Sequence, residues 1–526
     1  MKGISEKVYL ELAAPTEEDS RSDQQRILDG LKEAGFPAAF APAVLRRLYP
    51  LCEQARWKLT ASLAWDGAVW QVVELEAGDT RQRHYGLAVD LGSTTVVTRL
   101  IHCGTGQCLG EVSRYNGQIA YGTDILTRIF ACKDQPQVRE QIRQATVDTI
   151  RENLRELEEK TGVAGSDCIQ MTVAGNATMI HFLLGLDAFC VFSTPYAVHV
   201  DRPGFLPGAQ LGIPVKGYVF CFPCRSNYLG GDIVSGTLAT GFYRREGICA
   251  FFDIGTNGEL VLGNRDFLLC GAGAAGPALE GGSVKTGMRA VEGAVDRVGW
   301  QNGDLQVHVL GEGAARGICG SGIVDLLAVL FLHGWMDLKG RLNPGKSPRI
   351  QKREDSWAVE YAPGLFFDQE DIEEFVKTKA AAYTMVEYVL RESGISLEEL
   401  ETFYVAGAFG KHVDKESAIA IGLYPDLDRD RLVSAGNASL EGASQLLLDR
   451  SLLEDLDGIL ERMIYIQFGA VEDFLHIMIA AQAIPHTDLD RFPTVKKRLE
   501  EIRAEEAAGT PSGFSDPVPG PLLSGL

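Results

Sequence analysis

An internal repeat constrains the fold of this chain more than any other feature of its sequence. A predicted strand and tight turn at residues 87–96 is echoed by a second one at residues 251–260. Each copy is followed by an amphipathic helical pattern, at 138–161 and 371–393, and then by a strand that ends in Val-Ala-Gly. Because the same landmarks occur twice in the same order, the chain is predicted to contain two homologous α/β lobes that face each other.

We assign the two lobes to residues 83–241 and 242–500, and shorter segments flank them. Residues 1–82 predict a small α+β domain. Its expected elements are a strand at 7–12, a helix at 20–34, a shorter helix at 42–49 that Pro50 ends, and a hairpin formed by 57–63 and 68–75 across Asp66 and Gly67. The end of the chain, residues 501–526, is rich in Pro, Gly and Ser and predicts a disordered tail.

The composition is that of an ordinary globular protein and argues against some partners. The chain is 45% hydrophobic and 23% charged, and its formal net charge is -21. Nucleic acids and anionic membranes both attract surfaces rich in Lys and Arg, so this charge argues against either partner. The first residues contain no apolar run of the kind found in signal peptides, and the longest apolar stretches are too short to span a bilayer. We therefore expect a cytoplasmic protein.

The 11 cysteines are scattered along the chain and do not suggest a disulfide framework. The closest pair is Cys221 and Cys224, which fits two small core residues at the end of a strand. A redox pair, or half of a metal site shared between two chains, is the alternative that this spacing leaves open.

The two repeated turns have the residue types that bind nucleotide phosphates. In each, a strand ends in Asp-x-Gly, first at Asp90 and again at Asp253. The glycine allows a tight turn and a close approach of backbone to phosphate, while consecutive N–H groups and hydroxyls can hold phosphate oxygens. An aspartate at the strand end can hold Mg²⁺ through water. Two copies on opposite lobes predict a pair of turns around one nucleotide, with Gly92, Ser93, Thr94, Thr95, Gly255, Thr256, Asn257 and Gly258 as its phosphate-binding residues.

These turns resemble the two phosphate motifs of the superfamily of actin, sugar kinases and heat-shock chaperones. The resemblance implies an actin-like ATPase fold of duplicated ribonuclease-H-like lobes, with ATP and Mg²⁺ as cofactors and Asp90 and Asp253 as metal ligands. Residues 228–241 are similar to the superfamily's first connecting helix, whose acidic residue, here Asp232, often orients the attacking water. Two further segments resemble the adenosine motif and a glycine turn beside the cleft; they add Gly320, Ser321, Gly322, Gly407, Ala408, Phe409 and Gly410 to the implied binding residues.

Most of the chain, from about residue 5 to 500, also resembles the reductive activators of corrinoid proteins. The segments that carry this resemblance are 7–12 with 19–23, 116–128, 175–179, 274–282 and 485–488. It implies an ATPase that restores the Co(I) state of a Co(II) corrinoid protein in a methyltransferase system, and a homodimer is compatible with it. These activators usually carry an iron–sulfur domain with four clustered cysteines, whereas the first cysteine here is Cys52 and no such cluster follows. We therefore expect no iron–sulfur cluster within the chain, and a separate electron donor such as a ferredoxin, unless the ATPase serves another partner.

Two alternatives remain on the same fold: a small-molecule kinase, which would need a catalytic base that the sequence does not indicate, and an ATP-gated binding protein without a redox role.

Two glycine-rich motifs are misleading. Residues 340–347 fit the P-loop pattern, but Pro348 follows at once and no apolar strand precedes them. Residues 271–276 fit the dinucleotide fingerprint, but the glycines at 281 and 282 would break the helix that it requires.

Overall fold

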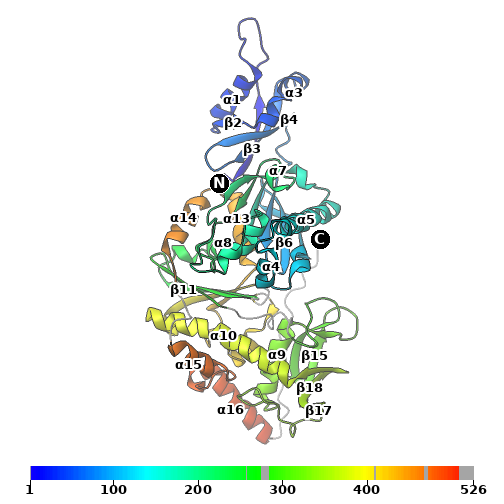
Figure 1. The fold of residues 1–526 in the computed structure, drawn as a ribbon, viewed down its shortest axis with the longest axis vertical. Helices are drawn as coiled ribbons and strands as arrows, with labels where there is room; N and C mark the ends of the chain where they lie inside the picture. Colours follow the sequence, from blue (N-terminus) through cyan, green and yellow to red (C-terminus); the bar gives the residue numbers. More distant parts are fainter. Residues whose placement is uncertain are drawn as a thin grey trace. The chain divides into compact units, whose positions relative to one another are not determined.

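The computed structural model describes residues 2–255, 257–273, 284–407, 410, 412–466 and 472–508. The chain divides into two compact units (Figure 1). Unit 1 consists of Met1–Arg244, Arg265–Leu268 and Asn437–Met463, and unit 2 of Arg245–Asn264, Leu269–Gly436 and Ile464–Leu526. Unit 1 therefore includes a segment from late in the chain, which brings distant residues to its core.

The first part of unit 1 is a four-stranded sheet in the order β1-β3-β4-β2, and Figure 1 shows α1 and α3 beside it in blue. Its elements are β1 (Ser5–Glu11), α1 (Asp23–Glu33), β2 (Ala38–Phe40), α2 (Pro42–Leu45), α3 (Leu48–Gln54), β3 (Lys58–Trp65) and β4 (Trp70–Ala77). The expected hairpin is present, with Trp65 opposite Trp70. The prediction that Pro50 ends the second helix is wrong: Pro50 lies in the first turn of α3, where a missing N–H leaves no helical hydrogen bond unmade.

The rest of unit 1 is built on a six-stranded sheet in the order β7-β6-β5-β8-β10-β9. Its strands are β5 (Tyr85–Leu91), β6 (Thr95–His102), β7 (Gln107–Tyr115), β8 (Cys168–Gly175), β9 (Gly204–Pro207) and β10 (Tyr218–Cys221). Strands β5, β6 and β7 are antiparallel neighbours, whereas β8 runs parallel to β5 and β10 runs parallel to β8. The helices are α4 (Ile125–Cys132), α5 (Pro136–Thr161), α6 (Ala177–Leu183), α7 (Gly208–Leu211), α8 (Gly231–Thr240), α13 (Ala438–Leu448) and α14 (Leu452–Arg462).

Helices cover both faces of this sheet. Leu87 and Val89 of β5 belong to one apolar cluster with Ile150 of α5. On the other side, Thr172 of β8 donates its hydroxyl proton to the carbonyl of Ala443 in α13 at 2.8 Å. Because successive side chains of a strand point to opposite faces, this double cover explains why every residue of β8 is buried.

Unit 2 repeats the topology of unit 1. Its six-stranded sheet has the order β21-β20-β11-β12-β13-β22, in which β11 is antiparallel to β12 and parallel to β20, and β20 is parallel to β21. These relations match those of β5 with β6, β8 and the next parallel strand, so the duplicated α/β lobes are confirmed. The strands are β11 (Ile248–Ile254), β12 (Gly258–Gly263), β13 (Leu268–Gly273), β20 (Leu400–Ala406), β21 (Leu432–Gly436) and β22 (Met463–Tyr465).

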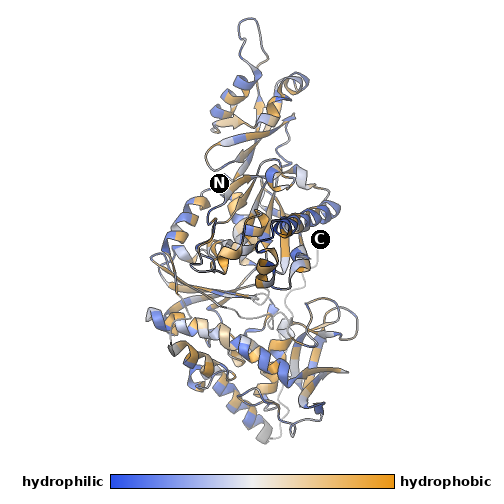
Figure 2. Ribbon diagram, in the orientation of Figure 1, coloured by the Kyte–Doolittle hydropathy of each residue, from blue (hydrophilic) through white to orange (hydrophobic). Residues whose placement is uncertain are grey.

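Two three-stranded sheets and several helices complete unit 2. The sheets have the orders β15-β14-β16 and β17-β18-β19, from β14 (Ala294–Gln301), β15 (Asp304–Val309), β16 (Gly317–Ile318), β17 (Ile350–Arg353), β18 (Ser356–Ala362) and β19 (Leu365–Asp368). The helices are α9 (Gly320–Leu332), α10 (Gln369–Ser393), α12 (Lys415–Ala420), α15 (Glu472–Ala481) and α16 (Pro493–Ala508). Figure 2 shows apolar residues along the strands and polar ones on the outer side of helices such as α5.

Helix α16 corrects the predicted boundary of the tail. It continues to Ala508, so residues 501–508 are helical and not disordered. Alanine and glutamate dominate this stretch, and both favour helix. The remaining residues of the predicted tail lie outside the described part of the chain. Within the described part, every helix is too short or too polar to span a bilayer.

Candidate functional site

The first predicted phosphate turn joins β5 to β6 in unit 1. Its backbone closes through a hydrogen bond from the N–H of Gly92 to the carbonyl of Thr95, at 3.1 Å. A Cβ atom on Gly92 would lie 2.6 Å from that same carbonyl oxygen, so the turn requires glycine. Ser93, Thr94 and Thr95 are partly exposed and can be reached from solvent. The side chains of this turn are therefore accessible, and phosphate binding by them stays a prediction.

Asp90, at the end of β5, is held by two residues from late in the chain. Its Oδ2 accepts a hydrogen bond from Asn437 Nδ2 and its Oδ1 accepts one from Ser439 Oγ, both at 2.8 Å. Asn437 also caps α13, because its Oδ1 accepts from the N–H of Leu440. Burial raises the pKa of Asp90, and the two hydrogen bonds partly offset that rise.

Asp232 is a second carboxylate in the same unit, in the first turn of α8. Burial, with a smaller contribution from the negative charge of Asp90, raises its pKa to about 7, although the N–H of Ile233 donates to Oδ1 at 2.9 Å and opposes the rise. The helix can begin here only because Gly230 lacks a side chain: its Cβ would lie 2.4 Å from the Cα of Asn176. Asp90 and Asp232 are therefore two partly buried carboxylates that influence each other.

These two carboxylates fit a Mg²⁺ ion. Desolvation and mutual repulsion both disfavour their ionised forms, and a nearby divalent cation reverses both effects. Mg²⁺ prefers oxygen ligands and keeps several waters, so one or two carboxylates are enough to hold it beside phosphates. When bound, the ion neutralises phosphate charge. Asp90 would hold it, and a bound ion would favour the ionised form of Asp232.

The second predicted phosphate turn joins β11 to β12 in unit 2, where the N–H of Gly255 donates to the carbonyl of Asn257 at 2.9 Å. Asp253 is partly exposed at the end of β11. Gly407, at the end of β20, lies against this turn with a φ of +83°; its Cβ would meet the Ile254 carbonyl oxygen at 2.4 Å and Asp253 Oδ1 at 2.9 Å. Unit 2 therefore brings the second turn and the start of the predicted adenosine motif together.

The second turn and the predicted adenosine motif contain two further glycines that the structure describes. Gly258 begins β12, and Gly410 needs to be glycine because its Cβ would lie 2.2 Å from the Val405 carbonyl oxygen. Thr256, Ala408 and Phe409 lie outside the described residues, as does the segment 274–282.

The glycine turn before α9 has a packing role in unit 2. The Cβ of an alanine at 322 would lie 2.4 Å from the carbonyl oxygen of Val295 in β14. Ser321 donates its hydroxyl proton to the carbonyl of Asp296 at 2.9 Å. Both contacts fix α9 against β14 without any ligand. Nucleotide binding by Gly320, Ser321 and Gly322 stays a prediction.

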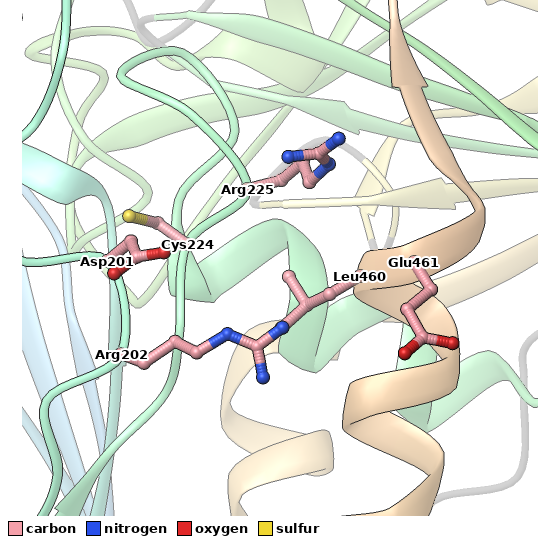
Figure 3. A pocket seen from close by; sticks show the side chains of 6 residues that line it. All are labelled: Asp201, Arg202, Cys224, Arg225, Leu460 and Glu461. Carbon is pink, nitrogen blue, oxygen red and sulfur yellow. The ribbon is translucent and has the colours of Figure 1, made fainter.

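Cys221 and Cys224 are both buried, and burial raises the pKa of each thiol to about 12, which disfavours the reactive thiolate. Cys224 borders a cavity of about 220 Å³ (Figure 3) whose lining residues are Asp201, Arg202, Cys224, Arg225, Leu460 and Glu461. In Figure 3 the Arg225 side chain points away from the thiol and the Glu461 carboxylate lies on the opposite side of the view, so the polar groups do not converge on one ligand. Among the described residues, no three His, Cys, Asp or Glu side chains gather closely enough to hold a metal ion.

The P-loop look-alike at 340–347 has the wrong surroundings for a phosphate site. It lies between α9 and strand β17, whereas a P-loop lies between a strand and a helix that starts at its lysine. The interpretation of this motif as misleading is confirmed.

Sequence reasoning missed Asn437 and Ser439. A signal for them exists, because Gly436-Asn-Ala-Ser439 echoes Gly175-Asn-Ala-Thr178. In both places an asparagine follows a strand that ends in glycine and caps a helix, since Asn176 caps α6 as Asn437 caps α13. This second repeat would have directed attention to the start of α13.

Family models of RACo match the chain almost throughout. The matched parts are the RACo linker region at residues 1–82, the RACo middle region at 85–245, and the C-terminal ASKHA domain of RACo at 247–496. A solved structure titled reductive activator for corrinoid, iron–sulfur protein is 33% identical, with a TM-score of 0.87 over 94% of this chain and 81% of that one.

Two relatives have curated descriptions. The corrinoid activation enzyme RamQ of Eubacterium limosum is 32% identical over 384 residues, which is 70% of this chain and 64% of that enzyme. The chain thus spans less than two thirds of the length of that relative. The [Co(II) methylated amine-specific corrinoid protein] reductase of Methanosarcina barkeri is 25% identical over 473 residues, which is 80% of this chain and 83% of the reductase.

Proposed function

Because this chain belongs to the family of reductive activators of corrinoid proteins, we propose that it uses ATP to return a corrinoid protein from Co(II) to Co(I). The observation that carries the proposal is the similarity to such an activator over 94% of the chain, at 33% identity. The pair of partly buried carboxylates, of which Asp90 lies in the strand that leads into the first phosphate turn, supports an ATP-dependent activity, since these residues fit Mg²⁺. The partner is a corrinoid protein of a methyltransferase system.

We assign roles to the site residues as follows. Asp90 and Asp253 hold Mg²⁺, and the two turns hold the phosphates. Asp232 orients the attacking water, a role that a carboxylate can fill by accepting a hydrogen bond from it. Gly407 and Gly410 allow backbone to approach the nucleoside. Phosphoryl chemistry needs mainly positioning and charge stabilisation, so this set is sufficient.

ATP binding and partner binding are coupled in this proposal. One phosphate turn belongs to each unit, so a nucleotide that touches both favours one arrangement of the units over the others. A ligand shifts such an equilibrium only by its differential affinity for the two states. A partner that prefers the ATP-bound arrangement must therefore tighten ATP binding by the factor by which ATP tightens partner binding.

A titration tests this coupling. A Co(II) corrinoid protein is titrated with the chain in the presence and absence of a non-hydrolysable ATP analogue, and the corrinoid absorption spectrum is recorded. We expect the analogue to tighten the complex by about fivefold or more, as in typical allosteric coupling. If neither the affinity for the corrinoid protein nor the corrinoid spectrum changes with the nucleotide, the activator function is excluded. A small-molecule kinase is then the favoured alternative. Stimulation of ATP hydrolysis by the corrinoid protein separates the activator from both alternatives.

The electron comes from a separate protein such as a ferredoxin. We expect anaerobically purified protein to contain no stoichiometric iron or acid-labile sulfide. About four irons per dimer, lost in Cys224→Ser, would instead indicate a cluster that two chains share through two thiolates each. That result would contradict the assignment of a donor in trans.

A further inference from the structure

Three consecutive carbonyl groups of the first phosphate turn each accept a hydrogen bond from one segment, residues 116–128. Asn116 Nδ2 donates to the Gly92 carbonyl at 2.9 Å, and the N–H of Asn116 donates to the Thr94 carbonyl at 2.9 Å. Between them, Arg128 Nη1 donates to the Ser93 carbonyl at 2.6 Å. In a trans peptide the C=O of one residue and the N–H of the next point in opposite directions. The N–H groups of Ser93 and Thr94 therefore point away from this segment.

Arg128 is fully enclosed behind the turn, with an exposed fraction of 0%. From α4, its Nε donates to the Gly122 carbonyl at 2.8 Å and its Nη1 also reaches Gln118 Oε1 at 3.2 Å. Gln118 is itself fixed to α5, because its Nε2 donates to Thr146 Oγ1 at 2.6 Å. The guanidinium is thus locked in one orientation by backbone and amide groups.

The charge of Arg128 is offset only in part: Asp124, the N-cap of α4, favours the charged form, while burial disfavours it more strongly. Among the described residues, no carboxylate forms an ion pair with it, and its Nη2 is buried without a hydrogen-bond partner. Burial lowers its pKa to about 10, so it stays charged at neutral pH. A buried cation without an ion-pair partner is costly to the stability of the empty fold. A phosphate on the far side of the turn would add negative charge beyond that of Asp124.

We propose that Arg128 is a positioning residue for the phosphates of the nucleotide. It cannot touch a ligand because it has no exposed surface, so it acts through the Ser93 carbonyl. A charge-assisted hydrogen bond to that carbonyl fixes the peptide between Ser93 and Thr94 and polarises it, which strengthens the Thr94 N–H as a donor. Asn116 fixes the two neighbouring peptides. This inference rests on the proposed use of ATP and names residues that the phosphate motif itself does not contain.

The test compares Arg128→Met with a matched control, Arg26→Met. Arg26 is also buried and also holds loop carbonyls, those of Asp19, Arg21 and Ala13, but in the N-terminal domain. The binding of MgATP and of adenosine is measured for each folded variant without any corrinoid protein. We expect Arg128→Met to weaken MgATP binding by about tenfold or more and adenosine binding by less than about twofold, because the lost interaction serves the phosphates. Arg26→Met should change neither affinity by more than about twofold.

The outcomes are separable. If the wild-type chain does not bind MgATP, the proposed function fails. If it does, two results refute the positioning role of Arg128 and leave the proposed function standing. Either Arg128→Met binds MgATP as tightly as wild type, or its affinity for adenosine falls by the same factor as its affinity for MgATP. Should Arg128→Met not fold, Arg128→Lys decides the question. A lysine cannot reach all three acceptors at once, so we expect MgATP binding about threefold weaker with unchanged adenosine binding. Wild-type MgATP affinity in that variant overturns the proposal.

Discussion

We expect Gly442→Ala to destabilise unit 1 and to loosen the residues that hold Asp90. Gly442 lies in α13 where that helix crosses α8. A Cβ atom at this position would lie 2.0 Å from the carbonyl oxygen of Ser235 and 2.6 Å from its hydroxyl oxygen. Real Cβ atoms essentially never come closer than 3.0 Å to such atoms, so the two helices must separate by about 1 Å or more.

The magnitude follows from three contributions. Overpacking of this kind costs about 1–3 kcal/mol. The separation also breaks the hydrogen bond from Ser235 Oγ to the Ser439 carbonyl, now 2.7 Å, and a lost hydrogen bond costs about 1 kcal/mol. In a helix interior, alanine is more favourable than glycine by about 1 kcal/mol, which offsets part of this loss. The expected net loss is about 2 kcal/mol. Because Ser439 also donates to Asp90, MgATP binding should weaken as well.

Equilibrium denaturation of Gly442→Ala and of a control, Gly458→Ala, checks this reasoning. Gly458 lies in α14 of the same unit, and its Cβ would meet only the flexible end of Arg462, at 3.3 Å. The control should be as stable as wild type or more stable by up to about 1 kcal/mol. Equal stability of the two variants would show that the close crossing of α8 and α13 is not what excludes a side chain at 442.

Two further predictions concern the site and the pH dependence of stability. Asp253→Ala should abolish ATP hydrolysis, while Lys346→Ala should leave it intact. Loss of hydrolysis in Lys346→Ala would instead indicate that the P-loop look-alike at 340–347 binds the nucleotide. His84 is 6% exposed and bonded to Ser5, and burial lowers its pKa to about 4 from 6.5. The folded state therefore binds a proton less readily than the unfolded chain, and stability falls by up to about 3 kcal/mol as the pH drops from 6.5 to 4. Denaturation of His84→Gln at pH 7 and pH 4.5 should show a smaller difference than wild type, and an unchanged difference would exclude His84 as the cause.

Local patterns in the sequence predicted those parts of the fold whose causes are local. The two Asp-x-Gly turns, the helices at 136–161 and 369–393 and the hairpin that pairs Trp65 with Trp70 were all expected from the repeat, from apolar periodicity and from turn residues. The errors also have local causes. Pro50 suggested a helix end, because proline is incompatible with a helix interior but tolerated in a first turn, and the sequence does not say which applies.

By itself, the sequence determined that two homologous lobes exist, which residues form their turns and which family they resemble, because each of these depends on residues close together or on repetition. Only the tertiary structure decided what holds the site. Asn437 and Ser439 reach Asp90 across 347 and 349 residues, and Arg128 reaches the Ser93 carbonyl across 35. Contacts of that separation leave no periodic pattern in the sequence, since they depend on where the folded chain returns. Helix α13 returns to unit 1 only after five strands of the unit 2 sheet, and α4 carries Arg128, whose guanidinium donates to the Ser93 carbonyl in the phosphate turn.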